Sequence, residues 1–155
     1  MLSGGGSDDI INGEAGTDFF YEIADADVTI IGEQVISIGI SPSVGTGTDM
    51  LFGIETIALV GGDSANTFDA TSSSLPVILL GGNGDDTLIG SDFNDVLVGG
   101  NRADSAAGTD LLTGNSGADI FDNDAGDDAS RVTDGDDSVI ADVFASPFPS
   151  WLDVI

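Results

Sequence analysis

One nine-residue stretch sets the pattern for this chain: Gly81-Gly82-Asn83-Gly84-Asp85-Asp86-Thr87-Leu88-Ile89. Glycine occupies the first, second and fourth places, aspartate the sixth and a large apolar residue the eighth. Glycine tolerates the positive φ angles of tight turns, and alternating side chains place the eighth residue on the inner face of a strand. The stretch therefore predicts a turn of about six residues that leads into a strand of about three.

The same spacing recurs on both sides of this stretch. Further units fit at residues 4–12, 13–21, 90–98, 114–122, 123–131 and 132–140, and a unit at 99–113 fits once an insertion at 102–107 is removed. Within the unit at 90–98, Ser91 and Phe93 stand where glycine is usual. Because glycine recurs every few residues and no sustained helical period is present, the pattern indicates an all-β repeat fold.

Residues 22–80 have a different character, with β-branched, alternating stretches in place of most glycine-rich turns. Strands are expected at 28–31, 35–38, 54–60 and 77–80, with a two-stranded excursion near residues 22–40. Residues 47–51 form a partial repeat, and Asn66 takes an aspartate place. We interpret residues 22–80 as degenerate solenoid coils with fewer metal loops. The glycine-rich repeats lie on either side, at 1–21 and 81–140, and residues 141–155 form a tail or cap. Pro147 and Pro149 confine any helix in that tail to its last few residues.

The charge of the chain is extreme and of one sign. Aspartate and glutamate total 28 against two arginines and no lysine, so the net charge is −26. Such a charge argues against nucleic acid or anionic membranes as partners and calls for cations as counterions. Calcium is the natural candidate, because it prefers oxygen ligands. The absence of histidine and cysteine excludes the usual zinc sites, thiol nucleophiles and imidazole triads. No apolar run approaches the length of a transmembrane helix, and no cleavable signal peptide is expected at Met1-Leu2-Ser3.

Stacked turns of this kind would form a row of oxygen cages. Glycines allow carbonyl oxygens to converge, the sixth-place aspartate adds a carboxylate, and cages of six or seven oxygens suit calcium better than magnesium. The candidate ligands, carboxylates together with the turn residues around them, are Asp9, Asp18, Gly81, Asn83, Gly84, Asp86, Gly90, Asp92, Asp95, Gly99, Asn101, Gly108, Asp110, Gly114, Ser116, Gly117, Asp119, Gly126, Asp128, Gly135 and Asp137.

These repeats resemble the RTX (repeats-in-toxin) family of calcium-binding nonapeptide repeats. The resemblance implies a parallel β-roll, a β-helix solenoid stacked on rows of several calcium ions, with each site between the turns of repeats n and n+2. The implied pairs are Asp86 with Asp110, Asp95 with Asp119, Asp110 with Asp128, and Asp119 with Asp137. Asp9 and Asp18 would belong to opposite rows. The resemblance also implies type I export to an extracellular or bacterial surface location, and the ending Leu152-Asp153-Val154-Ile155 is similar to that of some members.

The sequence favours a structural role over catalysis. Carboxylates are the only candidate catalytic acids or bases, and any pair is unremarkable among so many. The expected function is a calcium-binding scaffold segment of a secreted or surface protein, which folds when calcium binds. Two alternatives stay open: an adhesive or polysaccharide-binding module, and a subunit that stacks end to end with copies of itself or with neighbouring repeats into extracellular fibres.

Overall fold

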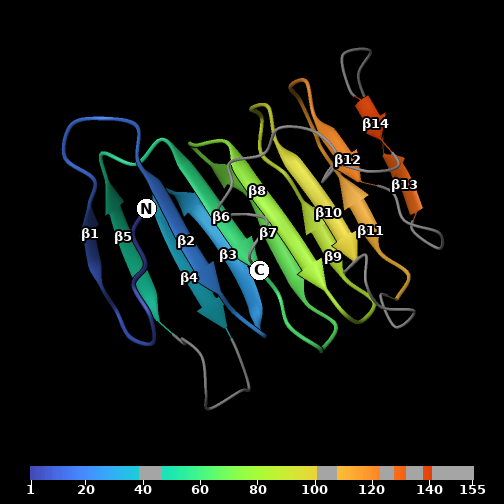
Figure 1. Ribbon diagram of the computed structural model, residues 1–155, viewed down its shortest axis with the longest axis horizontal. Helices are drawn as coiled ribbons and strands as arrows, with labels where there is room; N and C mark the ends of the chain where they lie inside the picture. Colours follow the sequence, from blue (N-terminus) through green and yellow to red (C-terminus); the bar gives the residue numbers. More distant parts are fainter. Residues whose placement is uncertain (39–46, 101–107, 123–127, 132–137, 141–155) are drawn as a thin grey trace.

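The computed structural model describes residues 1–38, 47–100, 108–122, 128–131 and 138–140 and contains two β-sheets (Figure 1). One sheet has eight strands, in the order β1 (Ile10–Asn12), β5 (Thr48–Phe52), β4 (Gln34–Ile38), β3 (Asp27–Gly32), β7 (Thr67–Ser73), β9 (Thr87–Ile89), β11 (Leu111–Thr113) and β13 (Asp128–Arg131). The other has six, in the order β14 (Ser138–Ile140), β12 (Ile120–Asp122), β10 (Val96–Gly100), β8 (Val77–Gly82), β6 (Thr56–Val60) and β2 (Phe19–Ile23). The expected all-β class with parallel sheets is confirmed.

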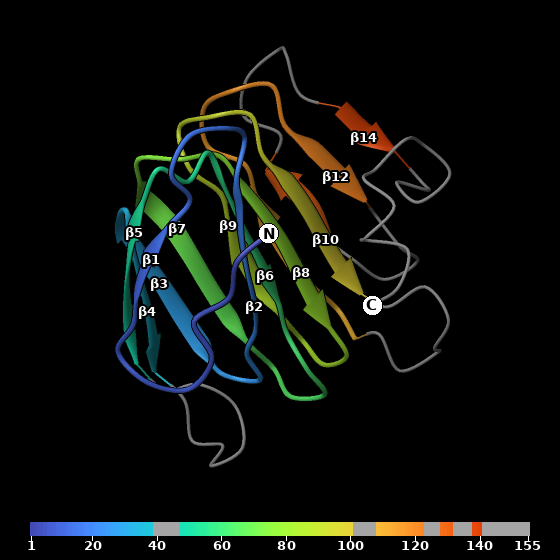
Figure 2. The ribbon, with the colours of Figure 1, turned by 60° about the vertical axis from the view of Figure 1, so that its left-hand side comes forward.

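From β5 onward, successive strands alternate between the two sheets, which face each other in Figure 2. Neighbours within a sheet are parallel from β6 to β14 and from β7 to β13. Val96 of β10 lies opposite Ile78 of β8, a separation of eighteen residues, or two nine-residue units. Leu111 lies opposite Thr87, a separation of twenty-four, because the insertion adds six residues to that circuit. The nine-residue period is thus the half-circuit of the chain.

The eighth-place apolar residues form the core between the sheets. Leu88, Leu97, Leu112 and Phe121 are fully buried, as the alternation of side chains across a strand requires. In the six-stranded sheet, core residues of neighbouring strands lie opposite one another and form a ladder: Leu59, Leu79, Leu97 and Phe121. Burial of each such side chain contributes roughly 1.5–3 kcal/mol, so the short strands depend on stacking for their stability.

The two-stranded excursion expected near residues 22–40 is present. Strands β3 and β4 are antiparallel, joined at Gly32, which has a φ of 63°, and β4 is in turn antiparallel to β5. The excursion widens only the eight-stranded sheet: β2 pairs directly with β6, whereas β4 and β3 separate β5 from β7. At this point of the stack, the eight-stranded sheet therefore has two strands with no counterparts in the six-stranded sheet, and we call the sheets out of step here.

Two expectations fall outside the described residues: the insertion at 102–107 and a short helix in the tail at 141–155.

Where β13 pairs with β11, the register shifts, so that Leu111 lies opposite Asp128 and Thr113 opposite Arg131. Within the described part of the chain, no helix has the length and apolar character needed to cross a membrane.

Candidate metal centre

The glycine-rich turns form two rows, one along each side of the stack. We call the turns that lead into the eight-stranded sheet the first turn row (residues 4–9, 61–66, 81–86 and the described end of a turn at 108–110). The turns that lead into the six-stranded sheet are the second turn row (residues 13–18, 90–95 and 114–119). Asp9 precedes β1 and Asp18 precedes β2, so these two aspartates lie in opposite rows, as expected.

Sixth-place aspartates of successive turns are joined through the backbone. In the first turn row, the N–H of Asp86 donates to Oδ1 of Asp110 over 2.8 Å. In the second, the N–H of Asp95 donates to Oδ1 of Asp119, also over 2.8 Å. All four residues are buried. The two loop pairings implied by the resemblance thus lie side by side, while calcium ligation by these aspartates stays a prediction.

A second bond runs in the reverse direction between the same turns. Oδ1 of Asp85 accepts from the N–H of Thr109 over 2.9 Å, and Oδ1 of Asn94 accepts from the N–H of Ala118 over 2.9 Å. We call this combination the reciprocal clasp: the sixth-place carboxylate of the later turn binds the earlier turn, and the fifth-place side chain of the earlier turn binds the later one. It joins successive turns through side-chain-to-backbone hydrogen bonds in both directions.

The same clasp identifies a partner that the sequence analysis did not assign. The N–H of Asp9 donates to Oδ1 of Asp49 over 3.0 Å, and the N–H of Thr48 donates to Oδ1 of Asp8 over 2.9 Å. Asp49 is therefore a sixth-place carboxylate, and the partial repeat at residues 47–51 was the signal that could have found it. Across the stack, the N–H of Asp18 donates to Oε2 of Glu55 over 2.7 Å.

Oxygen atoms converge at the first-place glycines. A Cβ on Gly81 would collide with Oδ2 of Asp86 and the carbonyl oxygen of Gly99, and one on Gly90 would collide with Oδ2 of Asp95 and the carbonyl oxygen of Gly114. Oδ2 of Asp86 is buried and has no hydrogen-bond partner. A buried carboxylate oxygen beside carbonyl oxygens, in space that only glycine leaves, fits the oxygen ligands and irregular geometry of a calcium ion.

Fourth-place glycines shape the same turns. Gly84, Gly108 and Gly117 have φ angles of 105°, 98° and 119°, which disfavour other residues. Their Cα atoms also pack against the backbone of the neighbouring turn: a Cβ on Gly108 would collide with the carbonyl oxygen of Gly84. These glycines act on turn shape and spacing.

The electrostatics of the turns favour a bound cation. Burial, with smaller contributions from Asp85 and Asp25, raises the pKa of Asp86 to about 7, although the bond from the N–H of Asn66 opposes the shift. Burial likewise raises the pKa of Asp95 and of Asp49. The chain has no basic side chain between Met1 and Asn101. A buried carboxylate without a basic partner must take up a proton or a metal ion to avoid a large desolvation cost.

The carboxylate of Asp95, in one of the predicted sites, already accepts hydrogen bonds from its own turn. In residues 90–95, the N–H of Ser91 donates to Oδ2 of Asp95 over 2.6 Å, and the Ser91 hydroxyl lies 2.9 and 3.0 Å from the two carboxylate oxygens. The N–H of Val77 donates to Oδ1 of Asp95 over 2.8 Å. The same hydroxyl accepts from the N–H of Phe93 over 3.1 Å, so Ser91 shapes the turn that lacks a fourth-place glycine.

The turn at residues 61–66 replaces its carboxylate by an amide. Oδ1 of Asn66 accepts from the N–H of Gly62 over 3.2 Å, and its Nδ2 donates to Oδ1 of Asp25 over 3.5 Å. The N–H of Asn66 still donates to Oδ1 of Asp86 over 2.7 Å. The turn therefore keeps its place in the row with an amide that donates to a carboxylate.

The remaining predicted residues have varied positions. Asp92 and Ser116 are exposed, and Nδ2 of Asn83 donates to Oδ1 of Asp63 over 2.8 Å. Asp128 opens β13, where the register shift sets it opposite Leu111 instead of Asp110, which displaces the expected Asp110–Asp128 pairing by one residue. Asn101, Gly126, Gly135 and Asp137 lie outside the described residues. Among those described, no three carboxylates gather at one point, so backbone carbonyls would have to complete each cage.

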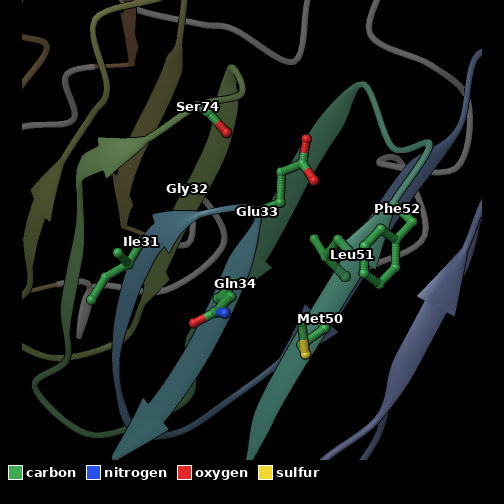
Figure 3. Close-up of a pocket in the computed structure, with 8 residues that line it drawn as sticks. All are labelled: Ile31, Gly32, Glu33, Gln34, Met50, Leu51, Phe52 and Ser74. Atoms are coloured by element: carbon green, nitrogen blue, oxygen red, sulfur yellow. The ribbon is translucent and has the colours of Figure 1, made fainter.

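A pocket lies on the excursion, lined by residues of β3, β4 and β5 and by Ser74 (Figure 3). It has a volume of about 400 Å³ and is lined by Ile31, Gly32, Glu33, Gln34, Met50, Leu51, Phe52 and Ser74. Ile31, Met50 and Phe52 are 40–50% exposed, so the pocket presents apolar side chains at the surface beside the polar Glu33, Gln34 and Ser74.

Comparison with protein families agrees with the turn geometry. The RTX calcium-binding nonapeptide repeat matches in four copies, over residues 1–21, 80–105 and 99–129. The chain carries RTX repeats. These RTX repeats include the turns with sixth-place aspartates at 9, 18, 86, 95, 110 and 119, and the unmatched stretch at 22–79 contains the antiparallel excursion. Searches among curated proteins and among solved structures found no match.

Proposed function

We propose that this chain is a calcium-dependent β-roll segment of an extracellular or bacterial surface protein, with a structural, non-catalytic role. The observation that carries the proposal is the stacking of buried carboxylates along each turn row in a chain of net charge −26. Without cations, these groups repel one another and lose their hydration on folding. Calcium bound between turns would compensate both costs, so binding and folding are coupled.

The first turn row supplies the strongest candidate site. Asp86 and Asp110, with backbone carbonyls such as that of Gly99, would hold the ion. Oδ2 of Asp86 and the carbonyl oxygen of Gly99 meet at Gly81, Oδ2 of Asp110 lies against Gly99, and the turns are already joined by the reciprocal clasp. In the second turn row, Asp119 and the carbonyl of Gly114 fit the same role. Asp95 fits it less well, because Ser91 and Val77 already donate to its carboxylate oxygens.

The location of folding follows from the affinity expected of such sites. Oxygen cages of extracellular modules bind calcium in the range of about 10⁻⁴–10⁻³ M, well above cytosolic levels. The chain would stay unfolded in the cytoplasm, which suits type I export of an unfolded polypeptide, and would fold outside the cell.

Circular dichroism during a calcium titration tests the proposal. Calcium is expected to produce the β-sheet spectrum cooperatively, EDTA to abolish it, and magnesium at equal concentration to be far less effective. A raised sodium chloride concentration controls for simple charge screening. A spectrum equally folded in EDTA would contradict the coupling of folding to calcium.

The pocket in Figure 3 favours a second candidate, a polysaccharide-binding or adhesive surface. Phe52 and Met50 are half exposed beside the polar Gln34 and Glu33, an arrangement that offers apolar contact and hydrogen bonding to one ligand. Retention of the calcium-loaded chain on alginate would support this role if Phe52→Ser abolished it and Phe93→Ser, at a similarly exposed aromatic residue, did not. Equal retention of both variants would count against the pocket.

A further inference from the structure

Glu22 occupies a core position that its neighbours fill with apolar side chains. In the six-stranded sheet it lies opposite Leu59, which continues the ladder through Leu79 and Leu97. Glu22 is only 4% exposed, and its Oε2 is buried with no hydrogen-bond partner. An ionisable side chain at such a position costs several kcal/mol unless another group compensates it.

The group beside Glu22 is another carboxylate, which adds to the cost of its charge. Glu22 lies within hydrogen-bonding reach of Asp49, and Asp9 adds to the negative potential at Glu22. Asp49 is 3% exposed, and its Oδ1 already accepts from the N–H of Asp9. Its Oδ2 lies against Gly4, where a Cβ would collide with it, just as Oδ2 of Asp86 lies against Gly81. Two buried carboxylates thus converge with no basic side chain between Met1 and Asn101.

The out-of-step sheets explain why this carboxylate comes from a strand. Strand β2 passes into β3 through residues 24–26, a link without the glycine-rich turn that follows β8. Ala24 takes the register of Gly61, and its N–H donates to the carbonyl oxygen of Val60 over 2.8 Å. The link from β2 to β3 therefore lacks the glycine pair that follows β8. Glu22, near the end of β2, places its carboxylate near this link from the core side.

We propose that Glu22 and Asp49 together bind a calcium ion, in a site that takes one carboxylate from the inner face of a strand and the other from a turn. The inference rests on the proposed calcium-dependent function and adds to it a site in the stretch where the glycine-rich repeats are interrupted. An ion here would neutralise the two carboxylates and join β2 to β5, which lie in opposite sheets at the point where the sheets are out of step. Backbone carbonyls and water would complete its coordination.

Native mass spectrometry of the full chain in calcium tests the site by counting bound ions. Glu22→Gln keeps the shape of the side chain, and Glu22→Leu restores the residue type of the ladder. Both are expected to bind one ion fewer than the unaltered chain, whereas Asp69→Asn, which removes one carboxylate from β7 outside the turn rows and the pocket, is expected to bind the full number.

Thermal unfolding supplies a second readout. Glu22→Leu is expected to reduce the rise in unfolding temperature between limiting and saturating calcium, because one of the stabilising ions is lost. An unchanged ion count in both Glu22 variants, while the unaltered chain binds several ions, would overturn this site alone. Failure of the unaltered chain to bind calcium would overturn the proposed function and this site with it.

Discussion

The backbone N–H of Asp86 lies 2.8 Å from Oδ1 of Asp110, and the N–H of Thr109 lies 2.9 Å from Oδ1 of Asp85. Two adjacent residues of one turn thus bind two adjacent residues of the next. One hydrogen bond is donated by the earlier turn and the other by the later turn. The arrangement positions the carboxylate of Asp110 through one oxygen, while its other oxygen lies against Gly99. Positioning and cation binding can therefore be separated by mutation, because each depends on a different part of the carboxyl group.

Asp110→Asn is expected to weaken calcium binding without dismantling the turn. The amide oxygen can still accept from the N–H of Asp86, but the negative charge is lost, which costs about 1.5–3 kcal/mol for a charge-assisted interaction. The calcium concentration at the folding midpoint should rise roughly tenfold or more, as measured by circular dichroism. Asp27→Asn, at an exposed aspartate whose Oδ1 also accepts a backbone N–H, is the matched control and should shift the midpoint little. Equal shifts in the two variants would indicate general charge reduction.

Gly81→Ala is expected to destabilise the calcium-loaded fold strongly, because the added Cβ collides with Oδ2 of Asp86 and the carbonyl oxygen of Gly99. Overpacking of this kind costs about 1–3 kcal/mol or more. Gly5→Ala separates crowding from backbone strain: Gly5 has a φ of 80° and open space around its Cβ position, so only about 1–2 kcal/mol is expected. Chemical unfolding in calcium measures both costs. A smaller loss for Gly81→Ala than for Gly5→Ala would contradict the crowded cradle.

Asn66→Asp is expected to add a calcium ion to the first turn row. A carboxylate there would face Asp25, to which the Asn66 amide now donates, and would gain a cage position beside Gly61. The variant should bind one more ion in calcium, as counted by native mass spectrometry. Asn12→Asp makes the same change of charge at an exposed position and should leave the ion count unchanged. No added ion in Asn66→Asp would show that the turn cannot form a cage.

Stability without calcium should fall as the pH rises. Burial raises the pKa of Asp86 to about 7 and also raises that of Asp95, so these groups contribute stability below their unfolded pKa values near 4 and lose it as the pH passes through the folded values. In EDTA, any residual β structure should therefore be greater at pH 5 than at pH 8. With calcium the trend should reverse between these limits, because calcium binds the deprotonated form. Circular dichroism at both pH values, with and without calcium, checks the sign. Greater order at pH 8 in EDTA would contradict it.

Much of the stack could be predicted from the nine-residue period, because the period encodes local structure. Leu88 and Leu112 are buried for the reason that their place in the unit indicates, and Asp86 and Asp110 meet because the chain repeats its circuit. Ser91 and Phe93 marked a turn that differs from the others, and that turn is shaped by the Ser91 hydroxyl.

The partners of the N-terminal repeats could not be predicted in this way. Asp9 meets Asp49 across forty residues because the β3–β4 excursion comes between the two aspartates in the sequence, and its length is set by long-range strand pairing. Glu55 meets Asp18 without a preceding glycine pair, so the pattern did not mark it. Glu22 carried no signal at all, because a single glutamate in a strand is usually exposed, and only the register with Leu59 places it inside.

The reciprocal clasp has a direction along the chain. At both Asp86 and Asp95, the sixth-place amide of the earlier turn is bound by a carboxylate that comes twenty-four residues later. Each of these circuits is therefore closed by a group from the circuit that follows it in sequence, so the last circuit of any such stack requires a closing group from elsewhere.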